Sequence, residues 1–265
     1  DQRPFFDINV QPPTRSDKKK SPPTHHMPPS KPSFFSTPND QNVLYGTTVY
    51  LVFIAAWLFS LLSPVLVLCL YYFHYKSAAL LVAASIAACY IVPWPHSPSF
   101  RSFMAKGSTV YFRNCSLTYE KDLSKETTPP KMLLAVHPHG IFCMGWSILF
   151  AREELKQFTF CFASSLYNSP YFRVLSKMIG NPDSADKHTF KTLMSKNTPI
   201  ALIPGGFESA TITNPNVARV HVSKKGFIKY SLQYGYSLVP CYVFNENQTY
   251  SNVQGCWPCR FWCNR

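Results

Sequence analysis

Two histidines stand close together at the end of an apolar segment. His137 and His139 form the motif His-Pro-His-Gly directly after residues 131–136, Lys-Met-Leu-Leu-Ala-Val, which have the composition of a buried strand. An imidazole titrates near neutral pH and can take the proton from an alcohol. Gly140 lets the chain turn there and approach a ligand closely. We predict that His139 is a general base and that His137 orients the loop; two structural histidines capping a turn are the alternative.

A second candidate loop follows another apolar segment, residues 199–204. Gly205 and Gly206 come next, and the backbone N–H groups of such a turn can bind an oxyanion or a phosphate. Glu208 is a candidate for holding an imidazole in one tautomer. Taken alone, the two glycines fit an ordinary turn equally well, and it is the histidine motif that favours a functional interpretation.

A third candidate site is a basic cluster formed by Arg219, Lys224 and Lys225, with His221 between them. It precedes a predicted helix over residues 226–234. The start of a helix exposes backbone N–H groups and favours anions. We predict that Arg219, Lys224 and Lys225 bind phosphate groups, with a plain basic surface as the alternative.

The net charge of the chain is +13 at neutral pH. Such a charge attracts nucleic acid, an anionic membrane surface or a phosphorylated ligand. The long uncharged apolar runs in the same chain argue against nucleic acid. The cysteines show no spacing typical of a disulfide scaffold. Cys256, Cys259 and Cys263 resemble half of a zinc site, but no fourth ligand is nearby, so we predict no metal.

These candidate residues must be positioned by the elements around them. Strands are predicted at residues 131–136, 158–163, 199–204 and 238–244, and helices at residues 141–150, 170–179 and 226–234. Alternation of this kind predicts an α/β fold with a mixed, mostly parallel sheet, whose ligands bind beyond the carboxyl ends of the strands.

The segment before this domain is apolar. Residues 43–73 contain no charged side chain, and this run exceeds the ~20 residues that span a bilayer. Residues 78–92 form a second, shorter run, so we predict a membrane-embedded helical hairpin with a kink at Pro64. Basic residues flank both ends, which places both ends on the cytosolic side. Two buried helices of a soluble core are the alternative.

Several motifs together resemble a known family. His-Pro-His-Gly, Pro-Gly-Gly, Lys-Lys-Gly-Phe at 224–227 and Leu-Val-Pro-Cys-Tyr-Val-Phe-Asn-Glu-Asn at 238–247 occur in the order and approximate spacing of type 2 diacylglycerol acyltransferases. Residues 93–95 and 169–173 are similar as well, and the resemblance runs from about residue 42 to 250. It implies a membrane enzyme of the endoplasmic reticulum and lipid droplets, with a cytosolic catalytic domain, that esterifies diacylglycerol with acyl-CoA to give triacylglycerol. Relatives that use monoacylglycerol or wax alcohols are the alternative.

The resemblance also implies roles for individual residues. The basic cluster would bind the phosphates of CoA, and Glu246 and Asn247 would have a structural or substrate-binding role. Acyl-CoA is then a substrate, and no cofactor is expected. Ser209 stands where the family usually has its Glu, so either Glu208 takes that role through a shifted turn or the role is lost.

Other reaction classes fit the sequence less well. Related phospholipid acyltransferases have an Asp after four intervening residues, but Phe142 and Met144 occupy those positions here. Ser147 lacks the second glycine of a nucleophile elbow, and Cys143 lacks a distinctive partner for a nucleophile. A non-catalytic hairpin protein or an inactive truncated relic is the alternative of another class.

The predicted organisation has four parts. Residues 1–42 form a disordered basic arm, 43–95 the hairpin, 96–250 the acyltransferase domain, and 251–265 an irregular tail rich in Cys and Trp. The chain begins at Asp1 and its tail resembles no family segment, so we expect both ends to be incomplete. The sequence leaves open whether copies of the chain associate. Two glycosylation sequons, at Asn114 and Asn247, should stay unmodified in a cytosolic domain.

Overall fold

The computed structural model describes residues 42–112, 115–118, 131–140, 142–216, 219, 221, 224–249, 255–256 and 259–260. The predicted arm and most of the predicted tail, including Cys263, lie outside these residues. Asn114 and Ile141 lie outside them too.

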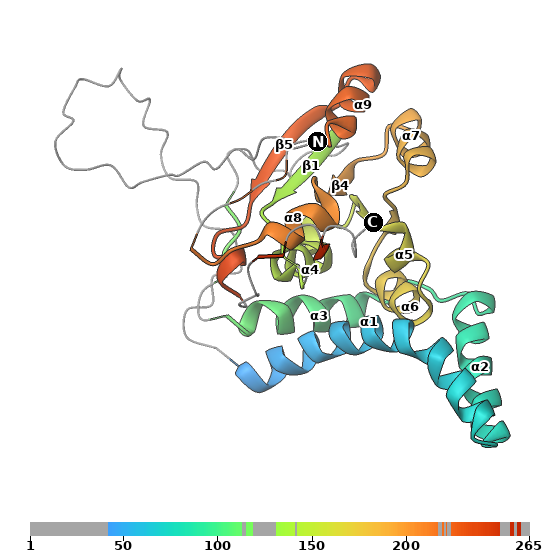
Figure 1. Ribbon diagram of the computed structural model, residues 1–265. Coiled ribbons are helices and arrows are strands. Elements are labelled where there is room, and N and C mark those ends of the chain that lie inside the picture. The colour runs from blue at the N-terminus through green and yellow to red at the C-terminus, as the bar shows by residue number, and fades with distance from the viewer. Residues whose placement is uncertain are drawn as a thin grey trace, which may run out of the picture.

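Three helices lie along one side of the molecule (Figure 1): α1 (Val43–Tyr72), α2 (Lys76–Ile91) and α3 (Pro98–Val110). Helix α1 is long and apolar enough to cross a membrane, whereas α2 is apolar but shorter. Asn42 begins α1 by accepting a hydrogen bond from the backbone N–H of Tyr45. Pro64 lies inside α1, and in Figure 1 the second half of α1 bends away from the first. The predicted long and short apolar helices are therefore both present.

The sheet has five strands: β1 (Met132–His137), β2 (Thr159–Phe162), β3 (Pro182–Ser184), β4 (Ile200–Leu202) and β5 (Ser237–Tyr242). Their order is β3-β2-β4-β1-β5, and each neighbouring pair is parallel. The predicted α/β fold with a parallel sheet is confirmed. Strand β3 was not predicted, because Pro, Asp and Ser are all uncommon in strands.

Most of the remaining described helices connect these strands: α4 (Met144–Ala151), α5 (Ser164–Tyr167), α6 (Pro170–Ile179), α7 (Lys187–Ser195), α8 (Gly206–Ile212), α9 (Gly226–Tyr234) and the 3-10 turn η2 (Glu153–Leu155). The 3-10 turn η3 (Glu246–Gln248) follows β5. Helices α6 and α9 have the predicted bounds. Helix α4 begins later than the predicted helix at 141–150, because Cys143 has a left-handed backbone with φ of 45° and does not continue a helix. Helices α3, α5, α7 and α8 were not predicted.

Helices α1 and α3 belong to the core of the sheet domain. Val49 of α1 and Met104 of α3 are fully buried in the same cluster as Leu134, Trp146 and Phe160. A Cβ on Gly107 would collide with Val49, so the two helices approach as closely as they do because residue 107 is glycine. The first half of α1 is therefore packed against the domain that carries the candidate site.

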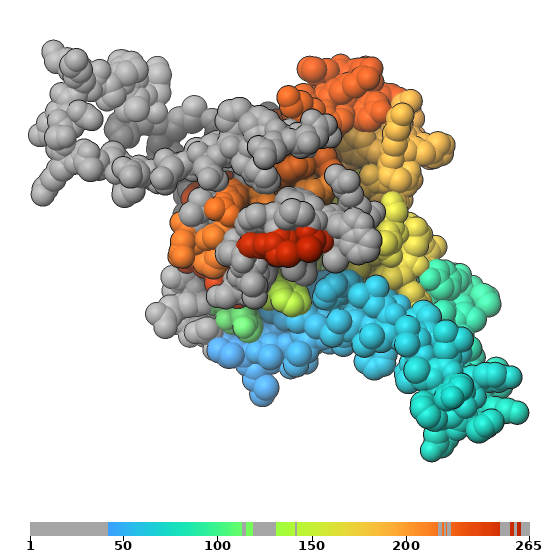
Figure 2. Space-filling model, in the orientation of Figure 1, coloured from blue at the N-terminus to red at the C-terminus, as the bar shows by residue number. Residues whose placement is uncertain are grey.

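The second half of α1 and α2 extend away from this domain, and Figure 2 shows them protruding from the rest of the molecule. Their surface carries many large exposed apolar side chains, among them Leu61, Leu62, Val65, Leu68, Leu80 and Leu81. Soluble surfaces rarely gather so many apolar side chains, and a patch of this kind is typical of contact with lipid or another protein.

Candidate active site

His139 lies just past the carboxyl end of β1 and is only 7% exposed. Its Nδ1 atom is 3.2 Å from the carbonyl oxygen of Gly140. A carbonyl oxygen can only accept a hydrogen bond, so Nδ1 carries the proton and Nε2 keeps a lone pair. Nε2 is buried and has no hydrogen-bond partner among the described residues. The ring is thus held in the tautomer that a general base needs.

Burial also determines the charge of this ring. Burial lowers the pKa of His139 from 6.5 to about 4, and the nearby backbone of Gly140 and Gly206 opposes this only in part. His139 is therefore neutral at pH 7. Burial lowers the pKa of His137 as well, and its carbonyl accepts a hydrogen bond of 2.7 Å from the N–H of Val243, just after β5.

The glycine loop lies beside the histidine loop because β1 and β4 are neighbours in the sheet. Gly205 and Gly206 follow β4 and have φ angles of 94° and 56°, a backbone that favours glycine. The hydroxyl of Thr213, at the end of α8, donates a hydrogen bond of 2.9 Å to the carbonyl of His139. The two predicted loops therefore form one site, as their places at neighbouring strand ends require.

Glu208 lies against Lys224 rather than against the ring of His139. Its Oε2 atom accepts a hydrogen bond of 2.6 Å from Nζ of Lys224, and neither ring nitrogen of His139 contacts it. Although burial opposes ionisation, the hydrogen bond from Lys224 and its positive charge hold the pKa of Glu208 below its ordinary value. The Gly140 carbonyl, rather than a carboxylate, fixes the tautomer of His139.

Ser209 occupies the position where the resembling family usually has its acid. Its side chain is buried, and its Oγ accepts a hydrogen bond from the N–H of His221 at 3.3 Å. A Cβ on Gly205 would collide with this Oγ. The serine thus connects the glycine loop to the basic segment instead of supplying a charge.

Glu246 binds the start of α4, just after the histidine loop, although it lies about 100 positions further along the sequence. Its carboxylate is 2% exposed and accepts hydrogen bonds of 2.8 Å from the backbone N–H groups of Met144 and Gly145. These groups open α4, whose N-terminus favours negative charge. Burial raises the pKa of Glu246, and the hydrogen bonds from Gly145, Met144 and Gly140 act against this rise. The structure gives Glu246 a structural role.

Asn247 connects two other segments of the site. Its side-chain amide donates hydrogen bonds to the carbonyls of Asn214 and Pro215, at 3.1 and 3.2 Å. Together with the bond from Thr213 to His139, this contact joins the end of β1, the end of α8 and η3. Thr213 and Asn214 were not predicted, because a lone Thr or Asn after a helix carries no distinctive signal.

Cys143 lies beside the base. Its Sγ donates to the Gly140 carbonyl at 2.8 Å and is 3.7 Å from Nδ1 of His139. Burial, reinforced by the charge of Glu246, raises the pKa of this thiol far above its ordinary value. A thiol that stays protonated is a poor nucleophile, so the arrangement argues against an acyl-cysteine intermediate.

The basic cluster lies at the predicted helix start. Lys225 is the N-cap residue of α9, and both Lys224 and Lys225 are exposed. Arg219 is half-buried. Lys224 connects this segment to the glycine loop through Glu208, and its Nζ lies close to Gly206.

An apolar side chain of α1 borders the histidine loop. The rings of Trp57 and Phe142 pack edge to face, with centroids 6.3 Å apart. Phe142 follows His139 by three residues and is 39% exposed. Helix α1 therefore contacts the loop that carries the candidate base.

Comparison with known proteins adds independent information. A family model described as diacylglycerol acyltransferase matches residues 70–259. The chain is 31% identical over 140 residues to diacylglycerol O-acyltransferase 2-like protein 6 of Mus musculus, which covers 47% of this chain and 41% of that protein. It is 32% identical over 139 residues to diacylglycerol O-acyltransferase 2 of Xenopus laevis. The matched region covers 47% of this chain and 38% of that protein.

A third relative is diacylglycerol O-acyltransferase 1 of Saccharomyces cerevisiae, 28% identical over 168 residues, covering 60% of this chain and 37% of that protein. The chain thus spans about two fifths of the length of these curated relatives. No solved structure matches the chain.

Proposed function

We propose that this chain, which belongs to the type 2 diacylglycerol acyltransferase family, transfers the acyl group of acyl-CoA to the free hydroxyl of diacylglycerol. The products are triacylglycerol and CoA. Membrane location follows the same proposal: the exposed apolar surface of α1 and α2 would lie in the bilayer of the endoplasmic reticulum or at a lipid droplet, with the sheet domain on the cytosolic side.

One observation carries the proposal. The Nε2 lone pair of His139 is buried, unpartnered among the described residues and on a neutral ring. A buried acceptor without a donor is unfavourable unless a ligand supplies one. The hydroxyl of an acceptor alcohol is such a donor, and its proton is the one that the reaction must remove.

The reaction then proceeds by direct transfer. Nε2 of His139 accepts the hydroxyl proton while the acceptor oxygen forms a bond to the thioester carbonyl carbon. Backbone N–H groups around Gly205 and Gly206 stabilise the resulting oxyanion. The carbon–sulfur bond breaks, and the CoA thiolate takes the proton from His139. General-base assistance of this kind is worth ~10²–10⁴-fold in rate.

The basic segment supports the orientation of the donor. Arg219, Lys224 and Lys225 would bind the phosphates of CoA, since they approach the site from the side of the glycine loop. Lys224 is already paired with Glu208, which holds its ammonium near Gly206. Lys224 is exposed, so a phosphate could contact its ammonium from solvent.

The proposal is tested with labelled oleoyl-CoA. Microsomes from cells that lack neutral-lipid synthesis would carry the full chain, and diacylglycerol, monoacylglycerol or a fatty alcohol would be supplied in turn. Label should enter triacylglycerol, and His139→Ala should reduce this by at least ~100-fold. His188→Ala is the matched control, because His188 is exposed on α7.

Each outcome has a definite meaning. If label enters only the ester of monoacylglycerol or of the fatty alcohol, that alcohol is the acceptor instead of diacylglycerol. No ester from any acceptor, with the protein present in the membrane, would overturn it in favour of a non-catalytic protein.

A further inference from the structure

Two cations on helix α6 lie close together without an acidic partner among the described residues. Arg173 and Lys177 are one helical turn apart on the same face of α6, and both are half-buried. Neither takes part in an ion pair within the described part of the chain. Burial lowers the pKa of Lys177, and the positive charge of Arg173 lowers it further. Two like charges at this spacing repel each other, so an anion bound between them would be stabilised.

The guanidinium of Arg173 is held by two aromatic rings. Its Cζ atom lies over the ring of Tyr90 on α2, 5.9 Å from the centroid, and over the ring of Tyr167 on α5, at 5.4 Å. Rings attract a cation through their faces and do not use its N–H groups. Among the described residues, none accepts a hydrogen bond from this guanidinium. Its planar fork of donors, which matches a phosphate, is therefore available to a ligand.

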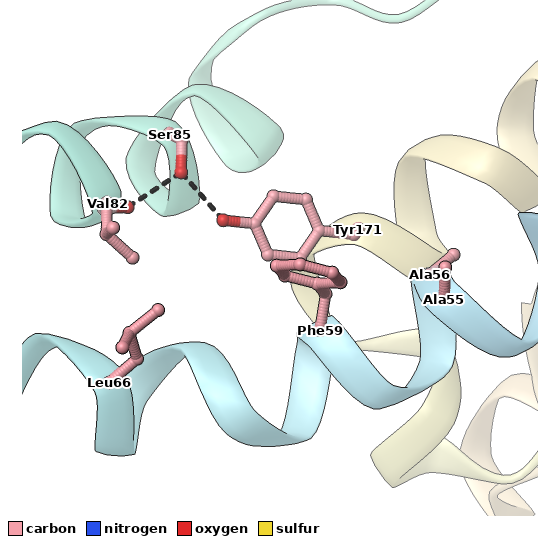
Figure 3. A pocket seen from close by; sticks show the side chains of 7 residues that line it. All are labelled: Ala55, Ala56, Phe59, Leu66, Val82, Ser85 and Tyr171. Carbon is pink, nitrogen blue, oxygen red and sulfur yellow. Dashed lines mark hydrogen bonds between the residues drawn. The ribbon is translucent and has the colours of Figure 1, made fainter.

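Helix α6 is fixed against α2 beside these cations. Tyr171 reaches from α6 to α2, where its hydroxyl lies 2.6 Å from Oγ of Ser85 (Figure 3). The hydroxyl of Tyr90 donates a hydrogen bond of 2.6 Å to the carbonyl of Asn168, just before α6. These contacts hold Tyr90 beside Arg173 before a ligand arrives, and such preorganisation favours binding because less freedom is lost.

The two cations lie where the apolar helices meet the sheet domain. Helix α6 packs against both α1 and α2 at this junction (Figure 1). Tyr90 at the end of α2 is 50% exposed, and Trp94 follows it at 36%. The N–H of Ser97 donates a hydrogen bond of 3.0 Å to the carbonyl of Met178, which brings this segment next to the end of α6. Exposed Tyr and Trp gather at membrane interfaces, so the cations would lie at the level of lipid headgroups.

We propose that Arg173 and Lys177 bind the phosphate of a phospholipid whose headgroup has a net negative charge. Arg173 would bind two phosphate oxygens through its fork, and Lys177 would contact the same phosphate as a point charge. A zwitterionic headgroup carries an ammonium that the two cations repel, so the site favours the anionic lipids of the cytoplasmic leaflet. The inference goes beyond the proposed reaction and needs only the membrane location of α1 and α2.

Lipid binding to the full chain tests this assignment. The chain would be purified in an uncharged detergent and mixed with dioleoylphosphatidylserine or dioleoylphosphatidylcholine, and the bound lipid would be counted by native mass spectrometry. Phosphatidylserine should bind more tightly than phosphatidylcholine. Arg173→Gln should weaken its binding ~10–100-fold, because hydrogen bonds to a charged group contribute a factor of this size. Lys177→Gln should weaken it by a smaller factor. Equal affinity of the wild type for the two lipids would overturn the proposal.

Two further variants distinguish a specific site from a plain basic surface. Lys191→Gln removes the same charge from α7, where Lys191 is exposed, and should bind phosphatidylserine as the wild type does. Arg173→Lys keeps the charge but lacks the fork, so it should recover little of the lost affinity. Wild-type affinity in Arg173→Lys, or equal losses in Arg173→Gln and Lys191→Gln, would refute the site. All variants should keep the Tm of the wild type; if Arg173→Gln does not, Lys177→Gln carries the test.

Competition decides where the phosphate comes from. Inorganic phosphate or CoA would be added to the complex with phosphatidylserine, and neither should displace the lipid, whose acyl chains contact the apolar helices. Displacement by CoA would assign the two cations to the acyl donor, and displacement by inorganic phosphate would mean a general anion site; either result would overturn the proposal. No ester forms in these measurements, so a failure of lipid binding leaves the proposed reaction standing, and a failure of ester formation leaves the lipid site standing.

Discussion

The chemistry of His139 depends on which of its ring nitrogens carries the proton. The Gly140 carbonyl places the proton on Nδ1, and burial keeps the ring neutral. In many hydrolases a carboxylate fixes the tautomer of the base. Here a backbone carbonyl does so, and Glu208 pairs with Lys224 instead.

The first prediction concerns the acid limb of the pH profile. The base form of His139 dominates above its pKa of about 4, so the rate should stay nearly constant from pH 7.5 down to pH ~5.5. An ordinary histidine would lose half of its base form near pH 6.5. Initial rates in buffered microsomes measure this, and a midpoint near pH 6.5 would contradict a buried base.

The second prediction concerns Thr213. Its hydroxyl donates to the carbonyl of His139, and Thr213→Val keeps the shape but leaves that buried carbonyl short of a donor. Such a loss is worth about 1–2 kcal/mol, so we expect a fall in kcat of ~5–30-fold with little change in the KM for acyl-CoA. Thr213→Ser retains the hydroxyl and should restore most of the rate. If the serine variant is as slow as the valine variant, kcat does not depend on the hydrogen bond from residue 213 to the His139 carbonyl.

At the scale of elements, two buried charged side chains, Glu246 and Arg101, bind the ends of helices that surround the site. Glu246 accepts hydrogen bonds at the N-terminus of α4. Arg101 of α3 is 4% exposed and donates to the carbonyls of Ala151, Ile179 and Arg152 at the C-terminal ends of α4 and α6. Helix ends have unpaired backbone groups, and these two side chains supply partners for them.

The third prediction is that Glu246→Gln slows the reaction without removing the protein from the membrane. A glutamine has one carbonyl oxygen, so its amide would face the second N–H group. A charge-assisted hydrogen bond is worth about 2 kcal/mol. If its loss raises the activation free energy by that amount, the rate falls ~30-fold. Gln248→Ala is the control, because Gln248 is exposed on the same turn. Equal rates for Glu246→Gln and the wild type would mean that the start of α4 does not position His139.

The fourth prediction concerns stability. Arg101→Met leaves the carbonyls at two helix ends without their donor, which should cost about 2–4 kcal/mol and lower the Tm in detergent by roughly 5–15 °C. Arg101→Lys should restore little, because an ammonium lacks the planar fork. Lys106→Met on the same helix is exposed and should leave the Tm unchanged. Similar Tm values for Arg101→Met and Lys106→Met would mean that the hydrogen bonds from Arg101 to the ends of α4 and α6 do not stabilise the fold.

At the scale of the whole molecule, an apolar helical part and a sheet domain share one core. The first half of α1 packs in the domain through Val49, and its second half protrudes with α2. This arrangement would bring the histidine loop close to the surface of a bilayer that surrounds the protruding part.

The fifth prediction tests this orientation. If the sheet domain faces the cytosol, the sequons at Asn114 and Asn247 should both stay unmodified. Treatment of the expressed protein with an endoglycosidase should not change its mass. A decrease in mass that Asn247→Gln abolishes would place the domain in the lumen and reverse the orientation.

Local pattern was enough to predict many of the elements. The uncharged run at 43–73 required a long apolar helix, and the alternation of strands and helices predicted a parallel sheet with His137 and His139 at a strand end. Helices over 170–179 and 226–234 were predicted with the bounds that they have. These features depend on side-chain periodicity and backbone preference, which are properties of short segments.

Only the tertiary structure decided how these pieces meet. The strand order β3-β2-β4-β1-β5 brings Gly206 next to His139, although no residue in either loop specifies this neighbour. The pairing of Glu208 with Lys224 and of Glu246 with α4 likewise joins segments 16 and about 100 positions apart. Such contacts follow from the packing free energy of the whole core, which is summed over distant segments. For that reason the sequence determined which residues can do the chemistry, and the fold determined which of them do it together.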